Sequence, residues 1–170
     1  MSLTSCKILW DRRRSMQELT LNQLIDTHPD RGAVPIACVK AICFVESSFD
    51  EFALRYEPGY KWLVGTDETL TATERMGQMC SWGLMQIMGG VAREAGFQGS
   101  FPHLCDPFLG LRYGLKHLTK FYMKYGYWQD ALAAYNAGSP RKGPDGKYLN
   151  YSYVEKVMKY WAQFEKPKEV

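Results

Sequence analysis

Several familiar patterns are missing from this 170-residue chain, and each absence argues against a class of protein. There is no GxSxG motif, no phosphate-binding GxxxxGK[ST] loop and no GxGxxG before a helix, so neither nucleophilic serine chemistry nor nucleotide binding has support. The five cysteines are odd in number and form no CxxC pair, which argues against a disulfide framework or a zinc site. We interpret them as buried free thiols of a protein made in a reducing cell.

Histidine and long apolar runs are also scarce. The three histidines, His28, His103 and His117, lie far apart without ligand-like spacing, so we expect no metal and no cofactor, and a structural role for His117. The first thirty residues hold no apolar run longer than "ILW", which excludes the core of a signal peptide. No stretch anywhere is long enough to span a bilayer, so we expect no stable membrane insertion.

The chain also lacks a large excess of either positive or negative charge. Lys and Arg number 21 and Asp and Glu 18, a net charge of +3, and only "DRRR" at 11–14 is densely basic. This balance fits weak attraction to an anionic polymer and falls short of the basic stripe of a nucleic-acid binder. With 46% hydrophobic and 14% aromatic residues, the chain can bury one substantial core, which favours a single domain over residues 1–170.

Apolar residues at helical spacing predict a mainly α fold. Helices are expected at 16–25, 36–49, 84–97, 107–125, 128–137 and 152–164, the third interrupted at Gly89–Gly90. Residues 1–33 would form an N-terminal helical extension. Residues 50–80 show no sustained period, and we expect them to be an insertion over a cleft, with room for a small irregular or β element.

One ionisable group stands on an apolar helix face. In "KAICFVESSFD", the residues Val39, Ile42, Cys43 and Glu46 follow the i, i+3, i+4, i+7 pattern. Either the helix ends there and the carboxylate turns to solvent, or apolar walls raise the pKa of the carboxyl group from about 4.3 toward roughly 6. An acid of the second kind can donate a proton at neutral pH, as cleavage of a glycosidic bond requires.

Four short motifs follow one another along the chain: "ESSF" at 46–49, "GLMQI" at 83–87, "AYNAG" at 134–138 and "YV" at 153–154. Together they closely resemble the soluble lytic transglycosylase family, and the resemblance extends from about Val34 to Trp161. It implies a lysozyme-like fold with a cleft, and cleavage of the MurNAc-(β1,4)-GlcNAc bond of peptidoglycan with formation of 1,6-anhydroMurNAc.

The resemblance also implies a role for each motif residue. Glu46 would be the catalytic acid and then base, with Tyr135 hydrogen-bonded to it as the second catalytic residue. Five residues would form the substrate site: Ser47 shaping it, the Met85 backbone and Gln86 contacting the sugar and its N-acetyl group, Asn136 lining the cleft and Tyr153 closing it. Amides suit an acetamido group because they offer both a donor and an acceptor, and a phenol orients a carboxyl group without adding negative charge.

Two departures from the family pattern bear on the reaction. Many members carry a Glu-Thr pair just before "YV", whereas "KYLNYSYV" has no acid there. The insertion at 50–80 contains five acids: Glu51, Glu57, Asp67, Glu68 and Glu74. Goose-type lysozymes, relatives that hydrolyse the bond, place auxiliary aspartates in that region, so one of these acids could hold a water molecule; the alternative is a solvated loop. We predict a lytic transglycosylase, with a hydrolytic muramidase as the nearest alternative.

An alternative of another class is a non-catalytic protein for cell-wall binding or assembly, against which the retained Glu46 and Tyr135 argue. A wall-cleaving domain without signal peptide, lipid-attachment cysteine or membrane segment suits an endolysin of a bacteriophage, released through a holin or carried in the virion. A bacterial enzyme exported by another route is the alternative setting. We expect peptidoglycan glycan strands as the partner, a monomer, synthesis in the bacterial cytoplasm and action at the cell wall.

Overall fold

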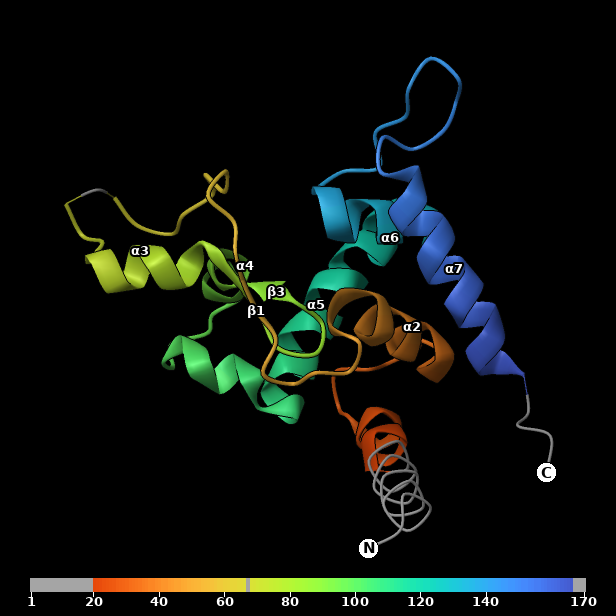
Figure 1. Cartoon of the computed structure of the whole chain (residues 1–170), viewed down its shortest axis with the longest axis horizontal. Helices are drawn as coiled ribbons and strands as arrows, with labels where there is room; N and C mark the ends of the chain where they lie inside the picture. Colours follow the sequence, from red (N-terminus) through yellow and green to blue (C-terminus); the bar gives the residue numbers. More distant parts are fainter. Residues whose placement is uncertain (1–19, 67, 167–170) are drawn as a thin grey trace, which may run out of the picture.

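The computed structural model of the chain describes residues 20–66 and 68–166 (Figure 1). Residues 20–27 are helical, in agreement with the C-terminal part of the first predicted helix. The earlier part of that helix, the basic run at 11–14, Cys6 and Asp67 lie outside the described residues. The elements that follow are α2 (Ile36–Ser47), β1 (Leu54–Tyr56), α3 (Ala72–Gln78), β2 (Cys80–Trp82), β3 (Ile87–Met88), α4 (Gly89–Glu94), the 3₁₀ helix η1 (Phe101–Cys105), α5 (Pro107–Tyr125), α6 (Trp128–Ala137) and α7 (Tyr151–Glu165).

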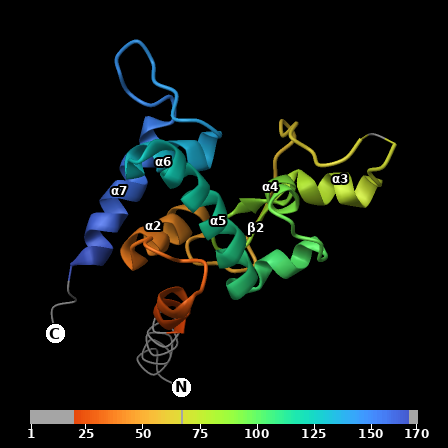
Figure 2. The ribbon, with the colours of Figure 1, turned by 180° about the vertical axis from the view of Figure 1, so that it is seen from behind.

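These elements form two lobes, each with its own apolar cluster. The large lobe contains α2, α5, α6 and α7, and its cluster includes Ile42, Leu115 and Val157. The small lobe contains α3, α4, η1 and the sheet, and its cluster is built around Trp82 and Leu104. Figures 1 and 2 show the two lobes side by side, with the long helix α5 between them. The predicted mainly α, lysozyme-like fold is confirmed.

Helix α5 is the scaffold that both lobes share, and its local sequence explains its ends. The carboxylate of Asp106 accepts a hydrogen bond from the Leu109 N–H at 3.0 Å, which caps the start of the helix. Gly126 ends it in the left-handed conformation, with φ of +77°. One face is buried, comprising Leu111, Leu115, Leu118 and Phe121, and burial of each leucine contributes about 1.5–3 kcal/mol.

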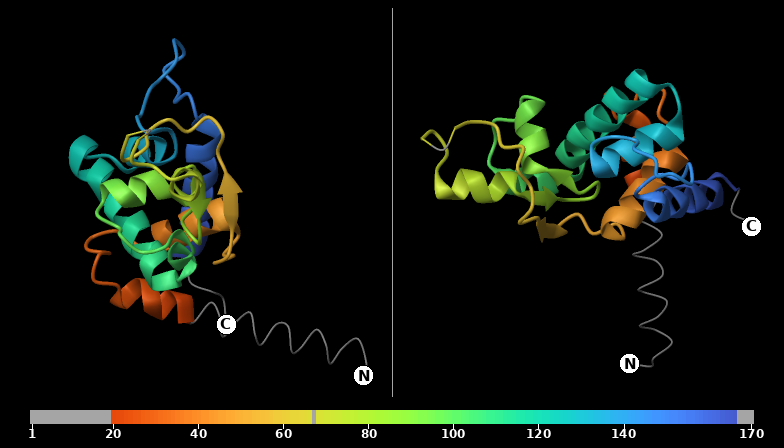
Figure 3. Two further views of the ribbon diagram at one scale, coloured as in Figure 1. Left: turned by 90° about the vertical axis from the view of Figure 1, so that its left-hand side faces the viewer. Right: turned by 90° about the horizontal axis from the view of Figure 1, so that it is seen from above.

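The insertion at 50–80 contains a β element, in agreement with the expectation that it could hold one. Strands β1, β2 and β3 pair antiparallel in that order, with Leu54 opposite Trp82 and Ser81 opposite Met88. β1 is therefore an edge strand, and Figure 3 shows it on the outside of the small lobe. Helix α3 completes the insertion, with the Thr71 hydroxyl accepting a hydrogen bond from the Glu74 N–H at its start.

The single predicted helix over 84–97 is wrong. Residues 83–86 form a turn, Ile87–Met88 is strand β3, and α4 covers only Gly89–Glu94. The apolar spacing that suggested a helix comes from residues that face the core while the backbone pairs with β2, so tertiary pairing overrides the local pattern. No helix of the described residues is both long enough and apolar enough to cross a membrane.

Candidate active site

Glu46 lies in the last turn of α2 and is half-buried. Its carboxylate does not turn away into solvent: the Tyr153 hydroxyl on α7 donates a hydrogen bond to Oε1 at 2.8 Å. The two helices are held together by aromatic packing, with the rings of Phe44 and Tyr160 centred 4.3 Å apart. The packing of α7 on α2 therefore brings together two residues that are 107 positions apart in sequence.

The pKa of Glu46 is raised above its ordinary value, and burial of the carboxyl group is the main cause. The negative charge of Glu57 adds to the increase. The hydrogen bond from Tyr153 and the charges of Arg55 and Lys156 act in the opposite direction, because they favour the ionised form. A position at the C-terminal end of a helix also disfavours an anion. Burial therefore shifts the balance of Glu46 toward its protonated form, and Tyr153 holds the carboxyl group in one orientation.

Tyr153 is positioned by the start of α7. Just before that helix, the Asn150 side-chain amide donates to the Ala133 carbonyl oxygen at 3.0 Å and to Asn136 Oδ1 at 2.9 Å, which fixes α7 on α6. Burial, followed by the charge of Glu46, raises the pKa of Tyr153 well above its ordinary value. The phenol therefore keeps its proton at neutral pH and remains a donor to Glu46.

The predicted hydrogen bond between Tyr135 and Glu46 is wrong. Tyr135 is buried on α6, and its hydroxyl donates instead to the Met85 carbonyl oxygen at 2.6 Å. A phenol has a single proton to donate, so the partner that Glu46 requires comes from α7. Tyr135 still lies within electrostatic reach of Glu46, since burial and then the charge of Glu46 raise the pKa of the Tyr135 phenol.

The turn at 83–86 is held from both sides by hydroxyl groups. Ser47 Oγ lies 2.8 Å from the Leu84 carbonyl oxygen and 2.9 Å from that of Cys43, and its one proton serves both. Tyr135 donates to the carbonyl that follows Leu84, that of Met85. Gly83 adopts φ of +69°, a conformation that disfavours any residue with a Cβ. Gly114 on α5 makes room for the turn, because a Cβ there would lie 2.5 Å from Met85 Sδ. The position of two consecutive carbonyls is thereby fixed beside Glu46.

Gln86 and Asn136, both predicted to contact the substrate, make hydrogen bonds within the protein. The Gln86 amide is engaged inside the protein: it accepts from Ser81 Oγ at 2.8 Å and donates to the carbonyl oxygens of Ala53 and Gly83. The side chain thus ties the turn to the sheet. Asn136 is exposed, and its Oδ1 accepts from Asn150. Asn150 is a functional residue that the sequence does not reveal, because its side chain bonds α6 instead of capping its own helix.

Backbone strain in the described residues gathers around this site. The non-glycine residues with positive φ there are Ser48 at 55°, Phe49 at 67° and Gln86 at 47°. Two of them follow Glu46 and Ser47 directly, and the third closes the turn that Ser47 contacts. Such conformations cost of order 1–3 kcal/mol each and tend to occur at functional sites. Their clustering supports a functional interpretation of this region.

The acids of the insertion differ in whether they influence Glu46. Of those that the structure describes, Glu57 is the one whose charge affects the pKa of Glu46. Glu57 forms an ion pair with Arg55, two residues earlier. Glu74 is paired with Arg93 at 2.7 Å, and Glu51 acts on the thiol of Cys105. Glu68 is exposed.

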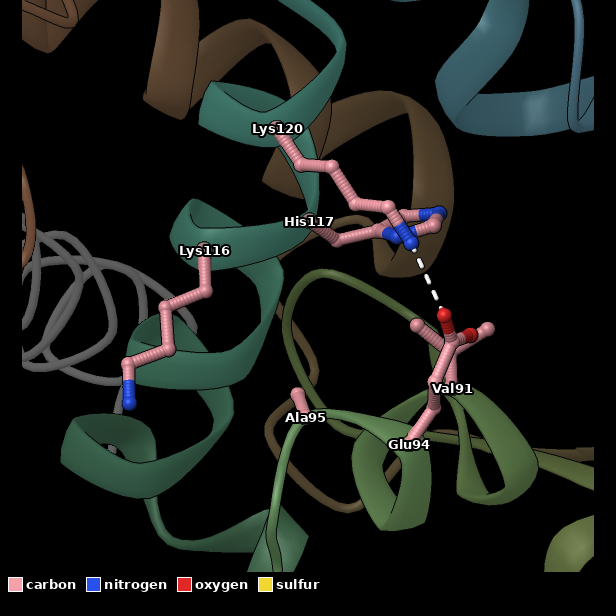
Figure 4. Close-up of a pocket in the computed structure, with 6 residues that line it drawn as sticks. All are labelled: Val91, Glu94, Ala95, Lys116, His117 and Lys120. Carbon is pink, nitrogen blue, oxygen red and sulfur yellow. Dashed lines mark hydrogen bonds and ion pairs between the residues drawn. The ribbon is translucent and has the colours of Figure 1, made fainter. Parts of the chain in front are cut away.

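A hollow of about 300 Å³ lies between α4 and α5 (Figure 4). It is lined by Val91, Glu94, Ala95, Lys116, His117 and Lys120. Burial, and then the charge of Lys120, lowers the pKa of His117 from 6.5 to about 4, so the imidazole is neutral at pH 7. Its ring packs 5.3 Å from that of Tyr135, which confirms a structural contact. The hollow does not contain Glu46.

Comparison with known proteins agrees with the geometry. Residues 23–156 match the family described as "Transglycosylase SLT domain". Protein IpgF of Shigella sonnei is 31% identical to the chain over 142 residues, which cover 81% of this chain and 78% of that protein. No solved structure matches the chain significantly. The chain therefore belongs to the transglycosylase SLT domain family, and is a lytic transglycosylase that cleaves glycosidic bonds of peptidoglycan.

Proposed function

We propose that Glu46 is the acid and then the base of a reaction that cleaves the MurNAc-(β1,4)-GlcNAc bond and forms 1,6-anhydroMurNAc. The observation that carries the proposal is the state of this carboxyl group. Burial raises its pKa, and Tyr153 holds Oε1 at 2.8 Å. Because Oε1 accepts a hydrogen bond from the phenol, the acidic proton resides on Oε2. That oxygen is the one that acts on the substrate.

In the first step, Glu46 transfers the proton from Oε2 to the glycosidic oxygen while the bond from that oxygen to the anomeric carbon breaks. The leaving sugar departs with a neutral hydroxyl group, and positive charge develops on the MurNAc ring. Glu46 is now ionised. The phenol of Tyr153 and the charges of Arg55 and Lys156 favour the ionised form, so they stabilise this stage of the reaction.

In the second step, the Glu46 carboxylate removes the proton from the 6-hydroxyl group of the same MurNAc. The oxygen then attacks the anomeric carbon and forms the 1,6-anhydro bond. No water is consumed, and Glu46 ends the cycle protonated as it began. One carboxyl group suffices because the acid and base roles follow one another, whereas a hydrolase of the two-carboxylate kind needs a second acid.

The neighbouring residues support Glu46 in this proposal mainly by positioning. Ser47 and Tyr135 hold the carbonyls of Leu84 and Met85, and a carbonyl oxygen with a remaining lone pair can accept a hydrogen bond from the N-acetyl group. Gln86 anchors the turn by its three internal hydrogen bonds. Asn136 contributes at the cleft edge through Asn150, which places the helix that carries Tyr153.

The substitution Glu46→Gln tests the assignment. It keeps the shape and removes the proton donor, and we expect release of soluble fragments from peptidoglycan to fall by about 10²–10⁴-fold, the usual contribution of a general acid or base. Glu68→Gln, a change at an exposed acid of the insertion, should leave the rate unchanged. Turnover by Glu46→Gln at the parental rate would refute the mechanism.

Thermal unfolding serves as the folding control for this variant. The pKa of Glu46 is raised in the folded state, so its ionisation costs stability as pH rises through that pKa. Glu46→Gln should therefore be at least as stable as the parent at pH 8, and the difference should disappear below about pH 4.3, where the unfolded chain is protonated too. Loss of activity with retained stability would separate a catalytic from a structural effect.

A further inference from the structure

Arg55 and Glu57 lie on the side of the sheet that faces the 83–86 turn. Arg55 is paired with Ser81 across β1 and β2, and residues directly opposite in an antiparallel pair share a face. The Ser81 hydroxyl bonds Gln86 in the turn, so that face is the one directed toward the active site. Glu57 lies two residues after Arg55, and its N–H donates to the Met79 carbonyl oxygen at 2.8 Å.

The charges of Arg55 and Glu57 change the pKa of Glu46 in opposite directions. Arg55 lowers the pKa of Glu46 and Glu57 raises it. The groups that bear on Glu46 also include Tyr153 and Lys156 of α7, and none of these is a carboxylate. Among the acids that the structure describes, Glu57 is therefore the one that combines this place at the end of β1 with an effect on Glu46, and its side chain is bound to the guanidinium of Arg55.

We propose that Arg55 determines the product of the reaction: by holding Glu57 in an ion pair it keeps this carboxylate from activating water, so that the 6-hydroxyl group of MurNAc attacks the anomeric carbon. The inference rests on the proposed role of Glu46. An arginine guanidinium holds a carboxylate in a defined direction, and so it fixes where the Glu57 oxygens point. Arg55 is thus a specificity-determining residue that acts through Glu57.

The competing step is chemically complete once Glu57 is released. Glu46 protonates the glycosidic oxygen as before. A water oxygen, instead of the 6-hydroxyl oxygen, forms the bond to the anomeric carbon, and Glu57 takes the proton of that water. Glu57 then releases this proton to solvent and Glu46 regains one from solvent, which returns both carboxyl groups to their starting states. The product then ends in reducing MurNAc in place of the anhydro sugar, and one water is consumed per bond. The two routes differ by 18 mass units, roughly the mass of that water.

The test compares the products of Arg55→Gln with those of the parent on the same purified peptidoglycan, by mass spectrometry of the soluble fragments. We expect the share of reducing MurNAc ends to increase several-fold over the parent. The double variant Arg55→Gln/Glu57→Gln is the matched control, because it removes the released carboxylate and should restore anhydro ends. Arg55→Lys keeps the charge without the fixed direction of the guanidinium, so its share of reducing ends should lie between those of the parent and of Arg55→Gln.

The outcomes separate this inference from the proposed function. Anhydro ends from the parent together with only anhydro ends from Arg55→Gln would overturn the role of Arg55 and leave that of Glu46 intact. Reducing ends from the parent itself would overturn the proposed function first. Equal amounts of reducing ends from the single and double variants would also contradict the inference, since Glu57 would then not be the base. The Arg55 side chain is exposed and that of Glu57 partly exposed, so the variants should fold.

Discussion

Glu46 experiences opposing influences that together suit the proposed role of an acid that then becomes a base. Burial at the end of α2 favours its neutral form, while Tyr153, Arg55 and Lys156 favour its ionised form. A group stabilised in only one state would perform one half of the cycle well and the other poorly. The balance is set by residues from β1 and α7, so the reactivity of Glu46 depends on how the two lobes meet around it.

The hydrogen bond from Tyr153 is the interaction whose removal can be measured most cleanly. Tyr153→Phe removes a donor that lowers the pKa of Glu46, so that pKa should rise further. In the proposed mechanism Glu46 must be protonated to start the reaction, and kcat/KM is therefore expected to fall as pH rises through its pKa in the free enzyme. We expect the alkaline limb of the pH profile to move to higher pH in Tyr153→Phe.

Tyr135→Phe is the matched control for that experiment. Its hydroxyl donates to the Met85 carbonyl oxygen and not to Glu46, so the variant should lower activity while leaving the alkaline limb in place. An alkaline limb that shifts in Tyr135→Phe and stays fixed in Tyr153→Phe would contradict the assignment of the two phenols.

The contrast between these two tyrosines shows what the sequence could and could not predict about the site. The apolar face of the helix around Glu46 singled out that residue, because its neighbours in sequence are also its neighbours in space. Tyr135 and Tyr153 belong to motifs far from Glu46, and which hydroxyl reaches it depends on the packing of α6 and α7. The ion pair of Arg55 with Glu57 likewise cannot be predicted from the sequence, because five acids of the insertion are equivalent there and only the folded chain shows which one Arg55 binds.

At the level of elements, the length of a helix or strand determines whether the sequence can predict it. Helices α2, α5, α6 and α7 are long enough to repeat an apolar pattern, and all four were expected at close to their observed bounds. β1 has three residues and β3 two, so neither can show a period of its own. These short strands and the turn at 83–86 exist because the sheet pairs across the chain, and they form one wall of the site.

The turn at 83–86 depends on Gly114 in α5. In an exposed helix, Gly→Ala would stabilise by about 1 kcal/mol, but here the new Cβ would lie 2.5 Å from Met85 Sδ and 2.8 Å from Met85 Cβ. The clash outweighs the gain in helix propensity, so we expect Gly114→Ala to lower the free energy of unfolding by about 1–3 kcal/mol. The variant should also lose activity, because the turn is displaced. Denaturant unfolding together with the activity assay measures both effects.

Gly59→Ala provides the control for this prediction, since a Cβ at Gly59 meets nothing within 4 Å. Its stability and activity should match those of the parent. A Gly114→Ala variant with increased stability and unchanged activity would show that α5 does not constrain the turn.

On the scale of the whole molecule, the site lies where the two lobes meet around α5. The large lobe supplies Glu46 and Tyr153, and the small lobe supplies Arg55 and Glu57. Lys120 of α5 also reaches across to Glu94 of α4, with 2.9 Å between Nζ and Oε1. The family assignment fixes peptidoglycan as the substrate class. Release through a holin, association with a virion and the monomeric state stay predictions.

Mass spectrometry of the fragments that the parent enzyme releases from purified peptidoglycan tests the central claim most directly. If Glu46 serves as acid and then as base, the MurNAc ends are 1,6-anhydro sugars, and Glu46→Gln releases almost none. Predominantly reducing MurNAc ends from the parent would contradict the account, because they would show that water, activated by a second group, takes the place of the 6-hydroxyl.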